Sequence, residues 1–234
     1  MDWLFFMEVT LAGLGSGALL SLTGLAFVLI YKATRVVNLA VGEILMLGAY
    51  MFLGFAAGTA LPIWAAIVLA MIAGGAIGAA MERLAIRPML GENTISVFMV
   101  TVGLGSIITG IVEIVWGADP RPLPEFMPRA PVFIGPAYVS SKVAVAFVAA
   151  ALVIAAFLLV FRFWRGGVAL RATAADQAAA YSCGINVPGV FSFAWIISCA
   201  TATGAGVLVG AIGGVSPTMG VFGLSVLVVV IVGG

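Results

Sequence analysis

Few residues of this sequence could do chemistry. None of the 234 residues is histidine, so the side chain most often used as general base, proton shuttle or metal ligand is missing. Two cysteines cannot by themselves complete a four-ligand zinc site. The only lysines, Lys32 and Lys142, do not follow a glycine as the lysine of a phosphate-binding loop does. The sequence therefore predicts no catalytic residue, no metal site and no cofactor.

Two carboxylates, Glu43 and Glu113, fall inside long apolar segments. An ionisable group within a bilayer is costly unless it is neutral, paired or facing water, so each is a functional hypothesis. Glu43 has two interpretations: a protonated or hydrogen-bonded carboxyl that joins helices near Asn38, or a residue that lines a translocation pathway with Asn38. Glu113 precedes Trp116 by three residues and is expected to be an anchor at the membrane interface.

The composition identifies the class of protein. Hydrophobic residues make up 64% of the chain and charged residues only 8%, whereas a soluble domain carries about 25% charge. The net charge of +1 gives no basic field for nucleic acid. The sequence predicts an all-α, polytopic transmembrane helical bundle that forms a single domain over residues 1–234.

Apolar segments of membrane-spanning length recur along the chain. They cover residues 9–31, 36–58, 63–81, 94–116, 143–161 and 188–213, and a seventh segment begins near Val221. The seventh has only 12 apolar residues, from Val221 to Val232, which is too short to cross a bilayer. We therefore expect about seven spans in a chain that is truncated at its C-terminus.

Positive charges predict the orientation. With the N-terminus outside, seven positive residues fall on the cytoplasmic side and three outside, as the positive-inside rule requires. Six prolines crowd residues 117–141, which are then an extended, non-helical external loop, and residues 162–187 form a cytoplasmic loop. The inner charges are Lys32, Arg35, Arg83, Arg87, Arg162, Arg165 and Arg171, and the outer ones are Arg121, Arg129 and Lys142.

Three spans carry small residues at every fourth position. Such ladders let helix backbones approach closely, and we expect packing within one subunit rather than a dimer seam or a pore lining. The ladders are Gly13, Gly17 and Ser21; Ala70, Gly74 and Gly78; and Ala202, Gly206, Gly210 and Gly214.

The cytoplasmic loop contains a short helix whose two ends are marked in the sequence. Thr173 can cap a helix over Ala174 to Cys183, with the carboxylate of Asp176 in its first turn. Gly184 can adopt the left-handed conformation that ends it. The helix has an alanine-rich face that includes Ala178 and Ala179, and it is marginal alone in water, so it is held either by a partner or by the bilayer surface.

Three separated motifs resemble one transporter family, the branched-chain amino-acid permeases of ATP-binding-cassette (ABC) importers. The motifs are Tyr31-Lys-Ala-Thr-Arg-Val-Val-Asn-Leu-Ala-Val-Gly-Glu-Ile-Leu-Met-Leu-Gly-Ala-Tyr50, Glu82-Arg-Leu-Ala-Ile-Arg-Pro88 and the stretch from Ala172 to Asn186. They occur in the family's order and on the expected membrane sides, and the resemblance covers nearly the whole chain.

The resemblance implies a function in transport without enzymatic activity in this chain. The Ala174–Cys183 helix would be the coupling helix that docks into a separate ATPase, with Gly184 as its stop. The implied coupling residues are Arg171, Thr173, Ala174, Asp176, Ala178, Ala179 and Gly184. The implied partners are two ATPase subunits, a second homologous permease, a periplasmic solute-binding protein, membrane lipid and a small solute, all at the bacterial inner membrane.

Other functions stay open at this point. Urea or amide permeases and aromatic-acid importers are similar families. A secondary transporter driven by protons through Glu43 would need no ATPase, and a scaffolding membrane subunit would carry no solute flux. A membrane enzyme would have little chemistry available without histidine.

Overall fold

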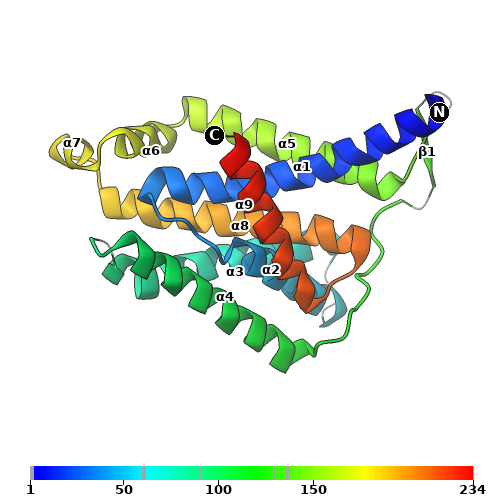
Figure 1. Cartoon of the computed structure of the whole chain (residues 1–234), viewed down its shortest axis with the longest axis horizontal. Coiled ribbons are helices and arrows are strands. Elements are labelled where there is room, and N and C mark those ends of the chain that lie inside the picture. Colours follow the sequence, from blue (N-terminus) through cyan, green and yellow to red (C-terminus); the bar gives the residue numbers. More distant parts are fainter. Residues whose placement is uncertain (1–2, 59–61, 90, 129, 135–136, 234) are drawn as a thin grey trace.

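The computed structural model describes residues 3–58, 62–89, 91–128, 130–134 and 137–233. It is a bundle of long helices, with one small sheet at the end where the described chain begins (Figure 1). Six of the described helices are long and apolar enough to cross a membrane. The prediction of an all-α, polytopic bundle is therefore confirmed. Residues 59–61, where a short connection between spans is predicted, and Arg129 and Pro136 of the external loop lie outside the described residues.

The long helices follow the predicted apolar segments. They are α1 (Trp3–Thr34), α2 (Val41–Gly58), α3 (Ile63–Met81), α4 (Thr94–Trp116), α5 (Ser141–Phe163) and α8 (Val187–Gly213). A π-helical turn, η1 (Glu82–Ile86), and a 3-10 turn, η2 (Arg87–Met89), extend α3. The shorter helix α9 (Phe222–Gly233) follows the 3-10 turn η3 (Pro217–Val221) and lies obliquely across the bundle in Figure 1.

Helix α8 is the centre of the bundle, and α1, α2 and α3 pack against it. Two of the small-residue ladders explain how closely these helices approach. A Cβ added at Gly78 of α3 would lie 2.6 Å from the Cys199 sulfur of α8, and a Cβ at Gly206 of α8 would collide with the Leu45 carbonyl of α2. The prediction of packing within one subunit is confirmed for these two ladders.

The ladder of α1 behaves differently. Added Cβ atoms at Gly13 and Gly17 would meet nothing within 4 Å, and both glycines, with Ser21, line a shallow groove between α1 and α5. The close contact with α5 comes instead from Gly15, which packs against Val143. The prediction of packing within one subunit is wrong for Gly13 and Gly17 of this ladder.

The second span begins later than predicted. Residues 36–40 are not helical, and Figure 1 shows them as an extended trace that leads from the end of α1 to α2. The backbone leaves the helix at Arg35, whose φ of 59° is unusual for a residue with a side chain. The Asn38 side chain then accepts the amide hydrogen of Ala40 at 3.1 Å, a local bond that competes with the helix.

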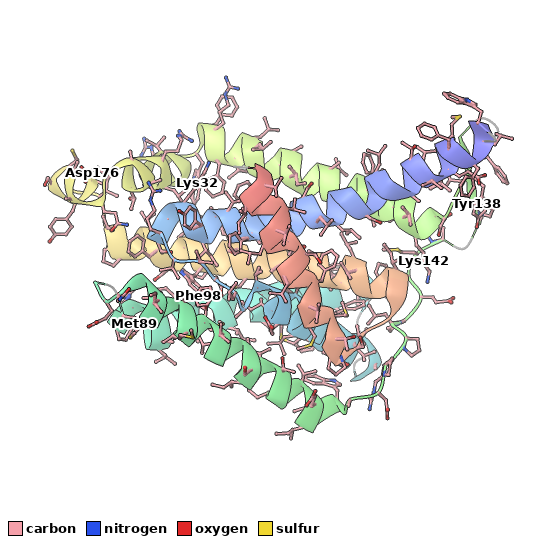
Figure 2. The ribbon with its side chains drawn as sticks, in the orientation of Figure 1. Lys32, Met89, Phe98, Tyr138, Lys142 and Asp176 are labelled. Carbon is pink, nitrogen blue, oxygen red and sulfur yellow. The ribbon has the colours of Figure 1, made fainter. Side chains whose placement is uncertain are left out.

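The predicted external loop contains a hairpin and is attached to α8 by a bridge. Strands β1 (Val132–Ile134) and β2 (Ala137–Val139) pair antiparallel, and the Glu8 carboxylate of α1 accepts the Tyr138 amide hydrogen at 3.1 Å. Arg121 and Val215 exchange two backbone hydrogen bonds, which attach the loop to the end of α8. Tyr138 and Lys142 lie at one end of the bundle, and Lys32, Met89 and Asp176 lie at the other (Figure 2). The fold thus separates the predicted outer and inner segments.

Candidate functional site

The predicted cytoplasmic loop folds into two short helices, α6 (Arg165–Ala175) and α7 (Gln177–Ser182), and α7 extends beyond the ends of the long helices in Figure 1. Asp176 separates them with an extended backbone, φ −153° and ψ 115°. Its carboxylate accepts the amide hydrogens of Ala178 at 2.8 Å and Ala179 at 3.0 Å, so Asp176 is the N-cap of α7.

This arrangement corrects the predicted helix from Ala174 to Cys183. Thr173 is not its cap: it lies inside α6, buried, and its hydroxyl donates to the Ala169 carbonyl at 2.9 Å. Ala174 belongs to the last turn of α6 rather than to the following helix. The predicted end is confirmed, because Gly184 has φ +82° and the Ile185 amide donates back to the Ala180 carbonyl at 3.1 Å.

Helix α7 is held on one side and exposed on the other. Ala180 is only 4% exposed and packs in an apolar cluster with α1, α6 and α8. Ala178 and Ala179 are exposed, and the neighbouring Tyr181 is 72% exposed. Small side chains beside an exposed tyrosine give a surface that another protein can approach closely.

Two arginines tie α6 to the long helices. Arg35, just after α1, donates to the Ala174 carbonyl at 2.9 Å. Arg171 donates to the Phe161 carbonyl near the end of α5. Both bonds satisfy helix-end carbonyls, which lack partners within their own helices. The base of the α6–α7 unit is thus attached to two membrane-spanning helices.

The other predicted site residues, Asn38 and Glu43, flank the start of α2. Asn38 is 1% exposed, and its side-chain nitrogen has no hydrogen-bond partner among the described residues. The non-helical residues around it are supported from α4: the Thr101 hydroxyl accepts the Leu39 amide hydrogen at 3.3 Å and lies 3.4 Å from the Val37 carbonyl. Non-helical backbone inside a membrane protein is tolerated where it is buried in protein or lines a cavity.

Glu43 lines a cavity of about 440 Å³ between α2, α4 and η3. One of its carboxylate oxygens is buried without a hydrogen-bond partner among the described residues. Gly105 of α4 and Gly220 of η3 both lie against this carboxylate, so the absence of two side chains makes room for it. The structure brings Glu43 to a polar-lined space but does not place Asn38 among the lining residues.

Helix α4 contributes a polar wall that the sequence interpretation missed. The wall repeats at every fourth position, which puts its members on one helix face: Thr101, Gly105, Thr109 and Glu113, with Ser106 beside them. Glu113, predicted only as an interface anchor, therefore also lines the cavity. The four-residue spacing is visible in the sequence. It indicates a cavity only when the structure shows that Glu43 faces this side of α4.

Comparisons with known proteins agree with this architecture. The family model described as "Branched-chain amino acid transport system / permease component" matches residues 9–234. The high-affinity branched-chain amino acid transport system permease protein LivH of Escherichia coli K12 is 27% identical over 249 residues, which cover 100% of this chain and 80% of LivH. The corresponding BraD of Pseudomonas aeruginosa is 26% identical over 219 residues, covering 88% of this chain and 71% of BraD. No solved structure matches. The chain belongs to the family of branched-chain amino acid transport permease components.

Proposed function

We propose that this chain is the membrane-spanning permease subunit of an ABC importer that takes up branched-chain or related amino acids across the bacterial inner membrane. LivH and BraD carry branched-chain amino acid transport in their names, and LivH matches over the whole chain. These relatives favour this function over the urea or amide, aromatic-acid and proton-coupled alternatives.

The observation that carries the proposal is α7, a capped helix with an exposed alanine face at the end of the bundle that the positive charges predict to be cytoplasmic. In this proposal α7 is the coupling helix, which docks into an ATPase subunit that hydrolyses the nucleotide. Asp176 fixes its start, Gly184 fixes its end, and Ala178 and Ala179 form the contact face. Arg171, Thr173 and Ala174 hold α6, the base on which α7 sits.

The cavity beside Glu43 is the proposed section of the translocation pathway. The ammonium group of an amino acid complements a carboxylate with one buried oxygen that lacks a partner among the described residues, and the α4 hydroxyls offer further hydrogen bonds. Asn38 does not line the cavity, and its role is to stabilise the non-helical segment that leads into α2. A second homologous permease, a periplasmic binding protein and surrounding lipid complete the proposed assembly.

The test is to purify the tagged permease gently from its native membrane and identify the co-purifying chains by mass spectrometry. Replacing residues 177–182 with a flexible Gly/Ser linker should remove the ATPase and leave the second permease bound. A control replaces the exposed residues 118–120, in the predicted outer loop, in the same way and should keep the ATPase. Retention of the ATPase after the α7 replacement would contradict the assignment of α7.

A further inference from the structure

An ion pair between a buried carboxylate and a partly exposed arginine lies at the end of α3, outside the surfaces described so far. Arg87 donates from Nε to Oε1 of Glu82 at 2.9 Å and from Nη2 to Oε2 at 3.1 Å. Glu82 is 1% exposed, although its turn lies at the end of the bundle that the positive charges predict to be cytoplasmic. A carboxylate this deeply buried requires its partners, because an unpaired charge in such a place is strongly unfavourable.

The π-helical turn is what brings these two residues together. Five residues of an α-helix turn through a full circle plus about 140°, so Glu82 and Arg87 would point to different sides of an ordinary helix. In η1 the Arg87 amide donates to the Glu82 carbonyl, five residues back, and the two side chains then lie over one another. π-helical turns are rare and occur frequently at functional sites.

The ion pair is also hydrogen-bonded to residues near the start of α8. Ser192 donates its hydroxyl hydrogen to Glu82 Oε2 at 2.8 Å, and its oxygen accepts from Arg87 Nη2 at 2.8 Å. The same Arg87 nitrogen lies 3.3 Å from the Pro188 carbonyl in the first turn of α8. Three side chains from η1, η2 and α8 thus form a closed hydrogen-bonded network, which rigidifies the elements it joins.

This network lies between the proposed coupling helix and the proposed pathway. On one side, α7 reaches α8 through a connection with little slack, in which the Gly184 and Ile185 amides donate back to α7 and Asn186 caps α8. On the other side, η2 leads into α4, which carries the polar wall of the Glu43 cavity.

We propose that Glu82, Arg87 and Ser192 are positioning residues for transport: their network passes a displacement of α7 through the start of α8 to the segment that leads into α4. The ATPase then changes the cavity wall without contacting α4. This inference rests on the proposed function, since it requires α7 to be driven by an ATPase. A physical connection becomes evidence of coupling only when both sites are shown to respond to it.

The experiment uses the intact permease with its partner subunits in proteoliposomes. Arg87→Lys keeps the charge but loses the bidentate contact with Glu82, and Ser192→Ala removes the side-chain hydrogen bonds to α8 and leaves only the Arg87 contact with the Pro188 carbonyl. Both variants should retain the ATPase and hydrolyse ATP, while the amino acid moved per ATP falls about tenfold. Arg83→Lys is the control, because Arg83 is an exposed cation of the same turn for which no partner is found in the described part of the chain.

A second readout separates coupling from mere stability. With Cys183 and Cys199 replaced by alanine, a single cysteine at Ser106 in the cavity wall is labelled with a water-soluble maleimide, with and without a non-hydrolysable ATP analogue. The nucleotide should change the labelling rate in the parent protein and leave it unchanged in Arg87→Lys.

Each result has one meaning. Unchanged coupling and a preserved labelling response in both variants would overturn the inference, and so would loss of the ATPase from the variant complexes, which would make the network merely structural. If the parent protein itself binds no ATPase and shows no ATP-dependent uptake, the proposed function fails instead.

Discussion

Gly105 of α4 and Glu43 of α2 face each other at the cavity so closely that a Cβ added at Gly105 would lie 3.1 Å from the Glu43 carboxyl carbon. That distance is below ordinary van der Waals contact, so an added methyl group must push the carboxylate or widen the gap between the helices. The position of the Glu43 carboxylate is therefore set by a residue that has no side chain.

The first prediction is that Gly105→Ala lowers uptake, because the methyl group displaces Glu43 within the proposed pathway. We expect about a tenfold loss in the rate of transport with normal assembly, measured as radiolabelled amino-acid uptake into proteoliposomes. Gly103→Ala, on the same helix, is the matched control, since a Cβ there would meet nothing within 4 Å. Equal uptake by the two variants would show that Glu43 needs no such space.

A second prediction concerns the charge of Glu43 itself. Glu43→Gln preserves the size of the side chain, so the complex should assemble, but the carboxylate that complements an ammonium group is lost. Uptake should fall about tenfold or more if the charge faces the solute. Glu92→Gln removes an exposed carboxylate outside the cavity and should be silent. Unchanged transport by Glu43→Gln would rule out a charged role in the pathway.

The third prediction tests the corrected start of α7. Asp176→Ala removes an N-cap that accepts two amide hydrogens, which typically costs about 1 kcal/mol, whereas Asp176→Asn can still accept them. Binding of the ATPase should weaken in the alanine variant and largely persist in the asparagine variant. Quantitative pull-down of the ATPase measures both. Thr173→Val should not mimic Asp176→Ala, because Thr173 is not the cap of α7.

A fourth prediction concerns the close contact of α3 with α8. Gly78→Ala would place a methyl group 2.6 Å from the Cys199 sulfur and 2.8 Å from the Trp195 carbonyl. Overpacking of this kind costs about 1–3 kcal/mol, so the melting temperature in detergent should fall. Gly13→Ala adds a methyl group at an open position of α1 and should leave the melting temperature nearly unchanged. A similar loss in both variants would mean that small residues matter here for reasons other than packing.

Most of the membrane-spanning helices could be predicted from sequence because length and apolar composition suffice to define them. The predicted segments 63–81 and 94–116 coincide with α3 and α4. The start of α2 could not be predicted in this way, because residues 36–40 are apolar apart from Asn38 and read as part of a span. What breaks the helix there is the backbone at Arg35 together with hydrogen bonds from Thr101, a tertiary contact that no local pattern records.

The residues of the candidate site could be predicted from sequence only in part. A short helix was predicted over residues 174–183 and α7 lies within that range, but Thr173 and Asp176 are both good N-cap residues, and local sequence does not choose between them. The choice depends on burial: Thr173 packs inside the protein and bonds its own helix, while Asp176 is exposed. The network of Glu82, Arg87 and Ser192 joins distant parts of the chain and needed a structure to be seen.

The non-helical segment before α2 also gives the molecule an internal reporter of gating. The Leu39 amide hydrogen is bonded to the Thr101 hydroxyl of α4 rather than to a carbonyl of its own helix. Its exchange with deuterium therefore depends on whether α4 stays against this segment, as native-state exchange depends on local opening in general. Protection of the Leu39 amide from exchange thus reports whether α4 has moved away from the segment before α2. This measurement needs no added label.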